Sequence, residues 1–321
     1  MLKIRQEVYD LYWYFAFERQ NIFYNKLNGK KEPWTDDPIL QEYKFCNAYR
    51  VSDRVSQYLI KNVIYNGHKY SDEDMIFRII LFKIFNKEST WELLVSKMGD
   101  IKLHNFDFNK CQKILEEAIL NNIKIYNDAY ISCPAKAFGF DKKHENHLAL
   151  LHKMFIEDNL AEKIINSKSM EEAFHHLKAY PLIGNFMAYQ LITDINYSEV
   201  TNFTETEFTV VGPGSIRGIK KCFYDIGEMS KEEVIKWMYE HQEEEFKRLG
   251  LDFKKLGTRK LQYIDCQNLF CEIDKYCRAK YPDLKSNRTK IKKKYIQKGK
   301  IDYFYPPKWN INLESYKDKA E

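Results

Sequence analysis

The sequence predicts an all-α fold. Its 321 residues include only 12 Gly and 8 Pro, and the segments between them carry Glu, Lys, Leu and Ile at helical spacing. Hydrophobic residues make up 44% of the chain and aromatic residues 15%, a load that is typical of a globular protein with a large core. The length allows one large domain or two closely packed ones, since a domain averages about 150 residues.

Composition also excludes several classes of protein. No apolar run approaches the roughly 18 residues that span a bilayer, and the N-terminal stretch MLKIRQEVYD lacks the apolar core of a signal peptide. We therefore expect a cytoplasmic protein without a membrane partner. Seven scattered Cys without a C-x-x-C pair indicate buried, reduced thiols.

The pattern divides the chain into helices and loops. The first predicted helix carries aromatic residues from Tyr9 to Phe23 and ends near Asn28-Gly29. A second helix is expected over about Pro38 to Lys61. In that second helix Arg50, Asp53, Arg54 and Gln57 would share one face. A loop is expected from Tyr130 to Asp141. Further helices are predicted over 72–85, behind a Ser71-x-x-Asp74 capping signature, and over 91–97, 110–123, 144–165, 170–178, 231–249 and 261–280.

The stretch LKAYPLIGNFMAYQ predicts two helices joined by a tight turn, a helix-hairpin-helix. The turn runs from Pro181 to Gly184, and the second helix begins at Asn185. Leu182, Ile183, Gly184 and Asn185 would hold a DNA phosphate through backbone amides and the positive end of that helix. The alternative is a turn that only connects two packed helices.

A second motif, EFTVVGPGSIRGIKKCF, follows the hairpin. It predicts a Gly-Pro-Gly turn that leads into a basic helix, and its candidate DNA-binding residues are Gly212, Gly214, Ser215, Arg217, Lys220 and Lys221. The order of the two motifs resembles the helix-hairpin-helix DNA glycosylase superfamily. Val211 and Gly212 stand where that superfamily has an Asp, so either the chemistry has moved to another carboxylate or the protein does not cleave glycosidic bonds. No G-x-x-x-x-G-K-[ST] nucleotide-binding loop occurs.

The helix expected from Leu261 to Tyr281 collects polar groups on one face. Asp265, Asn268, Glu272, Lys275 and Tyr276 fall within an arc of about 100° at helical spacing. This face combines an acid, a base and an amide, and the alternative is an exposed face with ion pairs. The histidines lack a third ligand at metal spacing, so the sequence predicts neither a metal site nor a cofactor.

The segment from Lys285 to Ile301 is rich in Lys and Arg and has no acidic residue. It could neutralise DNA phosphates or form a solvated helix face, and the residues alone leave both alternatives open.

Four stretches together carry a closer resemblance: FERQNIFYNKLNG, PWTDDPILQEYKFCNAYRVSDRVSQYLI, the pair LIGNFMAYQLITDINYS and GPGSIRGIKKCF, and DCQNLFCEIDKY. They resemble the α-glutamyl/putrescinyl thymine pyrophosphorylase-like family, also described as the helical domain of 5-hydroxymethyluracil DNA kinases. The family includes antiphage glycosylases that act on glucosylated hydroxymethylcytosine. The resemblance implies a helix-hairpin-helix glycosylase-like helical fold with an N-terminal helical extension. We expect an N-terminal subdomain over 1–130 and a glycosylase-like subdomain with the basic tail over 131–321.

The resemblance implies a monomer that acts on phage double-stranded DNA with modified pyrimidines. The main expectation is an antiviral DNA glycosylase that flips out and excises a bulky hypermodified pyrimidine and leaves an abasic site. Catalytic candidates are Asp265, Glu272, Asn268, Lys275 and, as an alternative carboxylate, Asp194. The pocket wall is expected to contain Glu18, Arg19, Gln20, Trp34, Thr35, Asp37, Arg50, Asp53, Arg54 and Gln57. The alternatives are an enzyme that hypermodifies an activated 5-hydroxymethylpyrimidine, as a pyrophosphorylase does, and a non-catalytic reader of modified DNA.

Overall fold

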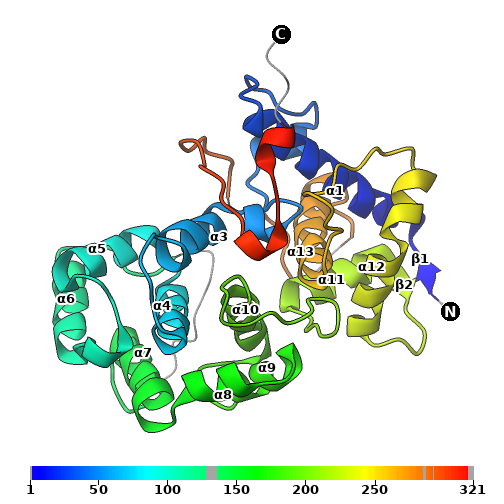
Figure 1. Ribbon diagram of the computed structural model, residues 1–321. Helices are drawn as coiled ribbons and strands as arrows, with labels where there is room; N and C mark the ends of the chain where they lie inside the picture. Colours follow the sequence, from blue (N-terminus) through cyan, green and yellow to red (C-terminus); the bar gives the residue numbers. More distant parts are fainter. Residues whose placement is uncertain (1, 128–135, 285–286, 292, 317–321) are drawn as a thin grey trace. The chain divides into compact units, whose positions relative to one another are not determined.

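The computed structural model describes residues 2–127, 136–284, 287–291 and 293–316, and it confirms the all-α prediction (Figure 1). Two short strands, β1 (Lys3–Ile4) and β2 (Phe223–Asp225), pair antiparallel. None of the helices in the described ranges is long and apolar enough to cross a membrane.

Contacts group the chain into two compact units. The first combines Met1–Asp53, Phe208–Tyr303 and Pro307–Glu321, and the second combines Arg54–Glu207 with Phe304–Pro306. The expected boundary between residues 130 and 131 falls in the segment 128–135, outside the described residues and within the span of the second unit. The two functional subdomains stay a prediction.

The first unit contains three long helices, α1 (Gln6–Leu27), α12 (Lys231–Arg248) and α13 (Tyr263–Lys280). Its other helices are α2 (Pro38–Glu42), η1 (Arg50–Ser52), α11 (Pro213–Cys222), η5 (Pro307–Trp309) and η6 (Leu313–Tyr316). The aromatic face of α1 packs on α13, where the rings of Tyr12 and Phe270 lie 4.8 Å apart and the Tyr12 hydroxyl donates to the Cys266 carbonyl. Burial of these large rings supplies much of the driving force for packing this unit.

Helix α11 approaches α13 at a glycine. A Cβ added to Gly218 would lie 2.0 Å from the backbone oxygen of Phe270, and one added to Gly214 would lie 2.6 Å from the Cys271 sulfur. Gly214 and Gly218 therefore permit the close approach of α11 to α13.

The second unit is also helical. Its elements are α3 (Arg54–Tyr58), the π-helical turn η2 (Leu59–Ile64), α4 (Asp72–Phe85), α5 (Glu88–Met98), η3 (Leu103–Asn105), α6 (Phe108–Leu120), α7 (Lys143–His152), the π-helical turn η4 (Lys153–Glu157), α8 (Leu160–Asn166), α9 (Met170–Lys178) and α10 (Asn185–Ile195). The capping of α4 by Ser71 agrees with the sequence signature. Arg78 of α4 is buried and donates to the carbonyls of Val63 in η2 and of Ile101 in the loop after α5, which fixes both segments against this helix.

The helix-turn-helix of the hairpin is confirmed, but its turn differs from the expectation. Leu182, with φ 68°, is the left-handed residue, whereas Gly184 has φ −81° and caps α10. A Cβ on Gly184 would meet nothing within 4 Å. Neither backbone conformation nor internal packing therefore requires glycine at this position.

The prediction of one helix from Pro38 to Lys61 is wrong. Helix α2 ends at Glu42, Tyr43 is extended, and the chain becomes helical again only at η1 and α3. Asp53 is itself extended, so Arg50, Asp53, Arg54 and Gln57 do not share a helix face. Long-range hydrogen bonds, described below, replace the helical ones between 43 and 53.

The expected loop and the basic segment are only partly described. Of the loop from Tyr130 to Asp141, residues 130–135 lie outside the described residues, as do 285, 286 and 292 of the basic segment. The described residues of the basic segment form no helix, so a solvated helix face is excluded for them. Lys294 there pairs with Glu42 at 3.3 Å.

The close approach of α11 and α13 generates a stability prediction. Gly218→Ala forces a methyl group onto a backbone carbonyl that cannot rotate away, and we expect it to lower the free energy of unfolding by at least about 2 kcal/mol. Gly184→Ala is the matched control, because its methyl group enters open space, and we expect a change of less than about 1 kcal/mol. Urea unfolding of both variants measures the difference, and equal stabilities would contradict the packing argument.

Candidate active site

The polar face of α13 is largely buried. Asp265 is 4% exposed and Glu272 is 8% exposed, whereas Asn268 and Lys275 keep partial exposure. Within α13, Asp265 accepts a hydrogen bond from the backbone N–H of Gln262 at 2.9 Å and so closes the first turn. These two carboxylates therefore do not lie on an exposed face, although Glu272 keeps an ion pair with Lys275.

Carboxylates organise the irregular segment between α2 and α3. Glu272 accepts from the Cys46 N–H at 2.9 Å, Asp53 from the Asn47 N–H at 2.8 Å, and Asp265 from the Arg50 N–H at 2.7 Å. Each of these backbone donors would otherwise bond a helical carbonyl. The segment is thus held against α13 in a non-helical path.

Two cations complete what we call the carboxylate cluster, defined as Arg19, Cys46, Asp53, Glu272 and Lys275. Arg19 reaches from α1 and donates to the Cys46 carbonyl at 2.8 Å. Lys275 donates to Glu272 at 2.6 Å and lies 4.4 Å from the centre of the Phe45 ring. Residues that are far apart in the sequence therefore form one cluster of two carboxylates and two positively charged side chains.

The environment shifts the protonation of this cluster. Burial raises the pKa of Asp53 to about 6; the Asn47 N–H and Arg19 oppose the rise and the negative charge of Glu272 adds to it. A carboxyl with a pKa near the working pH can both take up and release a proton. Burial also raises the pKa of the Cys46 thiol well above its ordinary value, so this Cys stays a neutral thiol.

The expected pocket residues separate into three groups. Arg19 and Asp53 belong to the carboxylate cluster. Glu18 accepts from the Thr35 hydroxyl at 2.7 Å, and the backbone of Arg50 is held by Asp265. Four others make structural contacts or are buried: Asp37 caps α2 and accepts from Tyr276, Trp34 lies against Lys26, Gln20 is buried, and Gln57 accepts from the Phe304 N–H.

The pocket candidates Arg54 and Gln57 and the alternative catalytic carboxylate Asp194 belong to the second unit. The other pocket candidates belong to the first. Asp194 is fully buried in α10 and forms an ion pair with Lys83 at 3.2 Å. This pairing compensates its charge inside the unit.

Most of the predicted DNA-binding side chains of α11 are held in contacts within the first unit. Ser215 donates to the Gln267 carbonyl at 2.7 Å, and Arg217 and Lys221 pair with the buried Asp274 at 2.8 and 3.1 Å. Lys220 alone of the three basic residues is exposed. It lines a cavity of ≈ 670 Å³ together with Arg5, Arg217 and Lys221.

Sequence reasoning missed Cys46, Asn47 and Asp274. Asp274 lies among Arg217, Lys221 and Arg278, and hydrogen bonds from these residues outweigh the effect of burial and hold its pKa below the ordinary value. The i, i+4 spacing of Asp274 and Arg278 was the one signal in the sequence. Cys46 and Asn47 bond the carboxylates through their backbone N–H groups, which no side-chain pattern reveals.

Comparisons with known proteins now decide the family. The model of the helical domain of 5-hmdU DNA kinase matches residues 6–286. The chain belongs to this family. It is similar to a 5-hmdU DNA kinase of Bacillus phage SP10, with 30% identity over 325 aligned residues that cover 94% of this chain and 50% of the relative. The chain thus spans about half the length of this relative. No solved structure matches it.

These findings correct the main functional expectation. The similar protein is a kinase of hydroxymethylated DNA and not a base-excising hydrolase, so the assignment as a DNA glycosylase in antiviral defence is wrong. The glycosylase-like motif order describes the arrangement of helices and not the reaction, because a fold hosts many chemistries. The alternative of a DNA modification enzyme agrees better with the 5-hmdU DNA kinase helical-domain family.

The raised pKa of Asp53 generates a pH prediction. The folded state binds a proton that the unfolded chain releases between about pH 4 and 6, so this group makes stability fall as pH rises through that range. The shift corresponds to roughly 3 kcal/mol, and we take about 2 kcal/mol because Asp53 keeps some exposure. Asn cannot ionise, so Asp53→Asn removes the cost of burying a charged carboxylate. The free energy of unfolding of Asp53→Asn relative to that of the natural protein should therefore rise by about 2 kcal/mol from pH 4 to pH 7.

Urea unfolding at both pH values measures the effect. Asp36→Asn, at an exposed carboxylate of the same unit, is the control and should leave the pH dependence unchanged. Parallel pH profiles for the natural protein and Asp53→Asn would show that Asp53 is not protonated in the folded state near neutral pH.

Proposed function

We propose that this protein acts on 5-hydroxymethylpyrimidines in DNA and modifies the base at its 5-hydroxymethyl group without removing it. The single observation that carries the proposal is the match of residues 6–286 to the helical domain of 5-hmdU DNA kinase. The carboxylate cluster lies within these residues and supplies acid-base groups for such a reaction.

The proposed step is substitution at an activated methylene carbon. The 321 residues contain no Walker-type phosphate loop, so phosphoryl transfer is not what we assign to them. An amine attacks the 5-methylene carbon, the bond between that carbon and the pyrophosphate oxygen breaks, and pyrophosphate leaves with the electron pair. The proton of the amine passes to a carboxylate of the cluster.

Asp53 and Glu272 are the proposed proton acceptors. Asp53 suits this role because its pKa is raised to about 6, which makes it a competent base at neutral pH. Lys275 uses one N–H on Glu272 and keeps partial exposure, so its other donors are available to an anionic leaving group. Asp265 accepts two backbone N–H bonds, and we assign it to positioning the segment between α2 and α3.

DNA contact is the second part of the proposal. A base inside a duplex must be flipped out before its 5-substituent reaches buried groups, and contacts to the backbone offset the unstacking cost of a few kcal/mol. Exposed Lys220, at the cavity beside α11, suits a phosphate contact. The open backbone around Gly184, at the start of α10, suits another.

The reaction can be tested with DNA that carries pyrophosphorylated 5-hydroxymethyluracil, supplied with glutamate or putrescine. We expect pyrophosphate release and a nucleoside that is heavier than 5-hydroxymethyldeoxyuridine by the mass of the amine less water. Asp53→Asn and Glu272→Gln should slow the reaction by about 100-fold or more, and Asp36→Asn should not. Binding of this DNA without a mass change would favour a non-catalytic reader, and abasic sites would overturn the proposal.

The phosphate contact predicts a change in salt dependence. Lys220→Ala should weaken binding to any duplex several-fold and reduce the slope of log affinity against log salt by about one. Lys247→Ala, exposed on α12, is the matched control and should change neither quantity. Fluorescence anisotropy at several salt concentrations gives both numbers, and an unchanged slope for Lys220→Ala would remove this residue from the DNA surface.

A further inference from the structure

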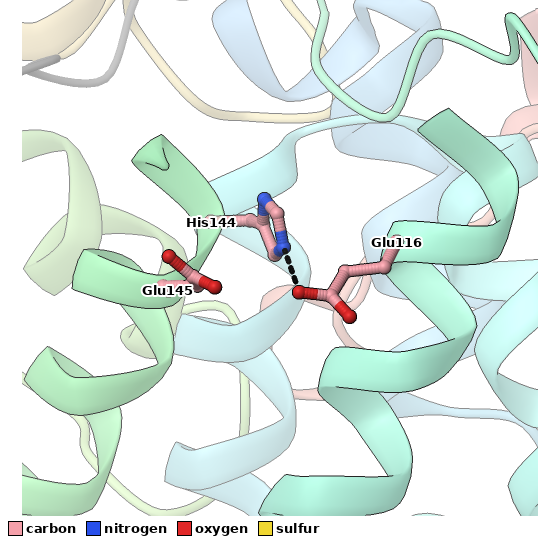
Figure 2. A group of neighbouring side chains, drawn as sticks. All are labelled: Glu116, His144 and Glu145. Carbon is pink, nitrogen blue, oxygen red and sulfur yellow. Dashed lines mark ion pairs between the residues drawn. The ribbon is translucent and has the colours of Figure 1, made fainter. Parts of the chain in front are cut away.

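Three side chains of the second unit converge between α6 and α7. Glu116 lies on α6, and His144 and Glu145 lie at the start of α7 (Figure 2). One ligand atom from each residue lies within 4.8 Å of the other two. Glu116 is the third ligand that the sequence pattern did not provide, because it comes from another helix 28 residues upstream of His144.

The histidine provides an independent observation. His144 is 2% exposed, and its Nε2 is buried without a hydrogen-bond partner among the described residues. Figure 2 shows this nitrogen directed toward Glu116, and it lies 3.8 Å from the nearer carboxylate oxygen, too far for a hydrogen bond. A buried polar atom without a partner is costly, and few are tolerated in folded proteins unless they serve a role.

The two carboxylates already face positive and polar groups. Lys142 Nζ lies 2.8 Å from Glu116 and 3.6 Å from Glu145, and the Gln112 side chain lies 3.2 Å from each of them. Lys142 thus serves both acids as a counterion, but it leaves His144 Nε2 unsatisfied. Its side chain is 57% exposed, so it can swing into solvent at little cost.

We propose that Glu116, His144 and Glu145 form a binding site for a divalent transition metal ion of the zinc type. An imidazole nitrogen with two carboxylate oxygens is a donor set suited to such an ion. Bond lengths near 2.1 Å in a tetrahedral site require ligand atoms about 3.4 Å apart, so the side chains need to close by only about 1.5 Å or less. A tetrahedral site needs a fourth ligand. Rotation of the Gln112 amide would turn its oxygen toward the ion, and a water molecule is the alternative fourth ligand.

The ion would act as a clamp between α6 and α7. The three ligands come from the two helices, and metal binding to a folded site stabilises the folded state because the unfolded chain lacks the site. The proposal is separate from the proposed DNA reaction, since all of its residues belong to the second unit and the carboxylate cluster belongs to the first.

Zinc binding to the purified, metal-free full chain tests the proposal. Equilibrium dialysis should find one high-affinity zinc ion per chain that depends on this site, and saturating zinc should raise the thermal midpoint by several degrees. Glu116→Gln and Glu145→Gln should each weaken binding at least about tenfold. Glu117→Gln, an exposed carboxylate one position along α6, is the matched control and should bind as the natural protein does.

A fourth variant distinguishes a metal site from a lysine ion pair. Lys142→Met removes the resident counterion and should bind zinc at least as tightly as the natural protein, whereas Mg²⁺ should not compete because imidazole is a poor ligand for it. The proposal is overturned if neither the natural protein nor Lys142→Met binds zinc stoichiometrically. It is equally overturned if the bound zinc is insensitive to Glu116→Gln and Glu145→Gln, since the cysteines would then be holding it.

Discussion

Hydrogen bonds from backbone amides to buried carboxylates set the path of the chain between α2 and α3. Glu272 holds the N–H of Cys46, Asp53 holds that of Asn47, and Asp265 holds that of Arg50. Without these acceptors the three amides would have to find helical carbonyls or water. The same contacts bury the carboxylates, and Arg19 donates to the Cys46 carbonyl in the same segment, so the path of this segment and the geometry of the candidate site depend on the same hydrogen bonds.

Charge in this protein is buried mainly in local, compensated groups. Asp274 lies among Arg217, Lys221 and Arg278, and Asp194 lies beside Lys83. Such clusters add little net stability, because desolvation offsets attraction, but losing one member leaves an uncompensated charge. The carboxylate cluster differs because the burial of Asp53 is not fully compensated: burial raises the pKa of this carboxyl to about 6, and the negative charge of Glu272 adds to the rise. This imbalance distinguishes a chemically useful site from a structural ion pair.

Sequence reasoning succeeded where periodicity controls the outcome. The 3.6-residue spacing placed Asp265, Glu272 and Lys275 on one face of α13, and Ser71 and the Pro181–Gly184 stretch marked helix ends that exist. It failed between residues 43 and 53, where the helical pattern was real but acceptors more than 200 residues away competed for the backbone. No local window contains such partners. For the same reason Glu116 could not be joined to His144 from spacing, because they come from different helices.

The error in function has a related physical cause. The hairpin and the basic helix describe how a domain can hold a DNA backbone, and backbone contacts carry no information about the bond that is broken. Excision and substitution at the 5-methylene group both need a flipped base, a carboxylate and a compensating cation, so the residue types of α13 suit either reaction. What separates the two reactions is the atom of the flipped nucleotide that lies beside Asp53 and Glu272: the sugar C1′ for excision, and the 5-methylene carbon of the base for substitution. Since membership in the 5-hmdU DNA kinase helical-domain family points to the 5-substituent, the carboxylate cluster should be judged by its distance to that carbon in a complex with modified DNA.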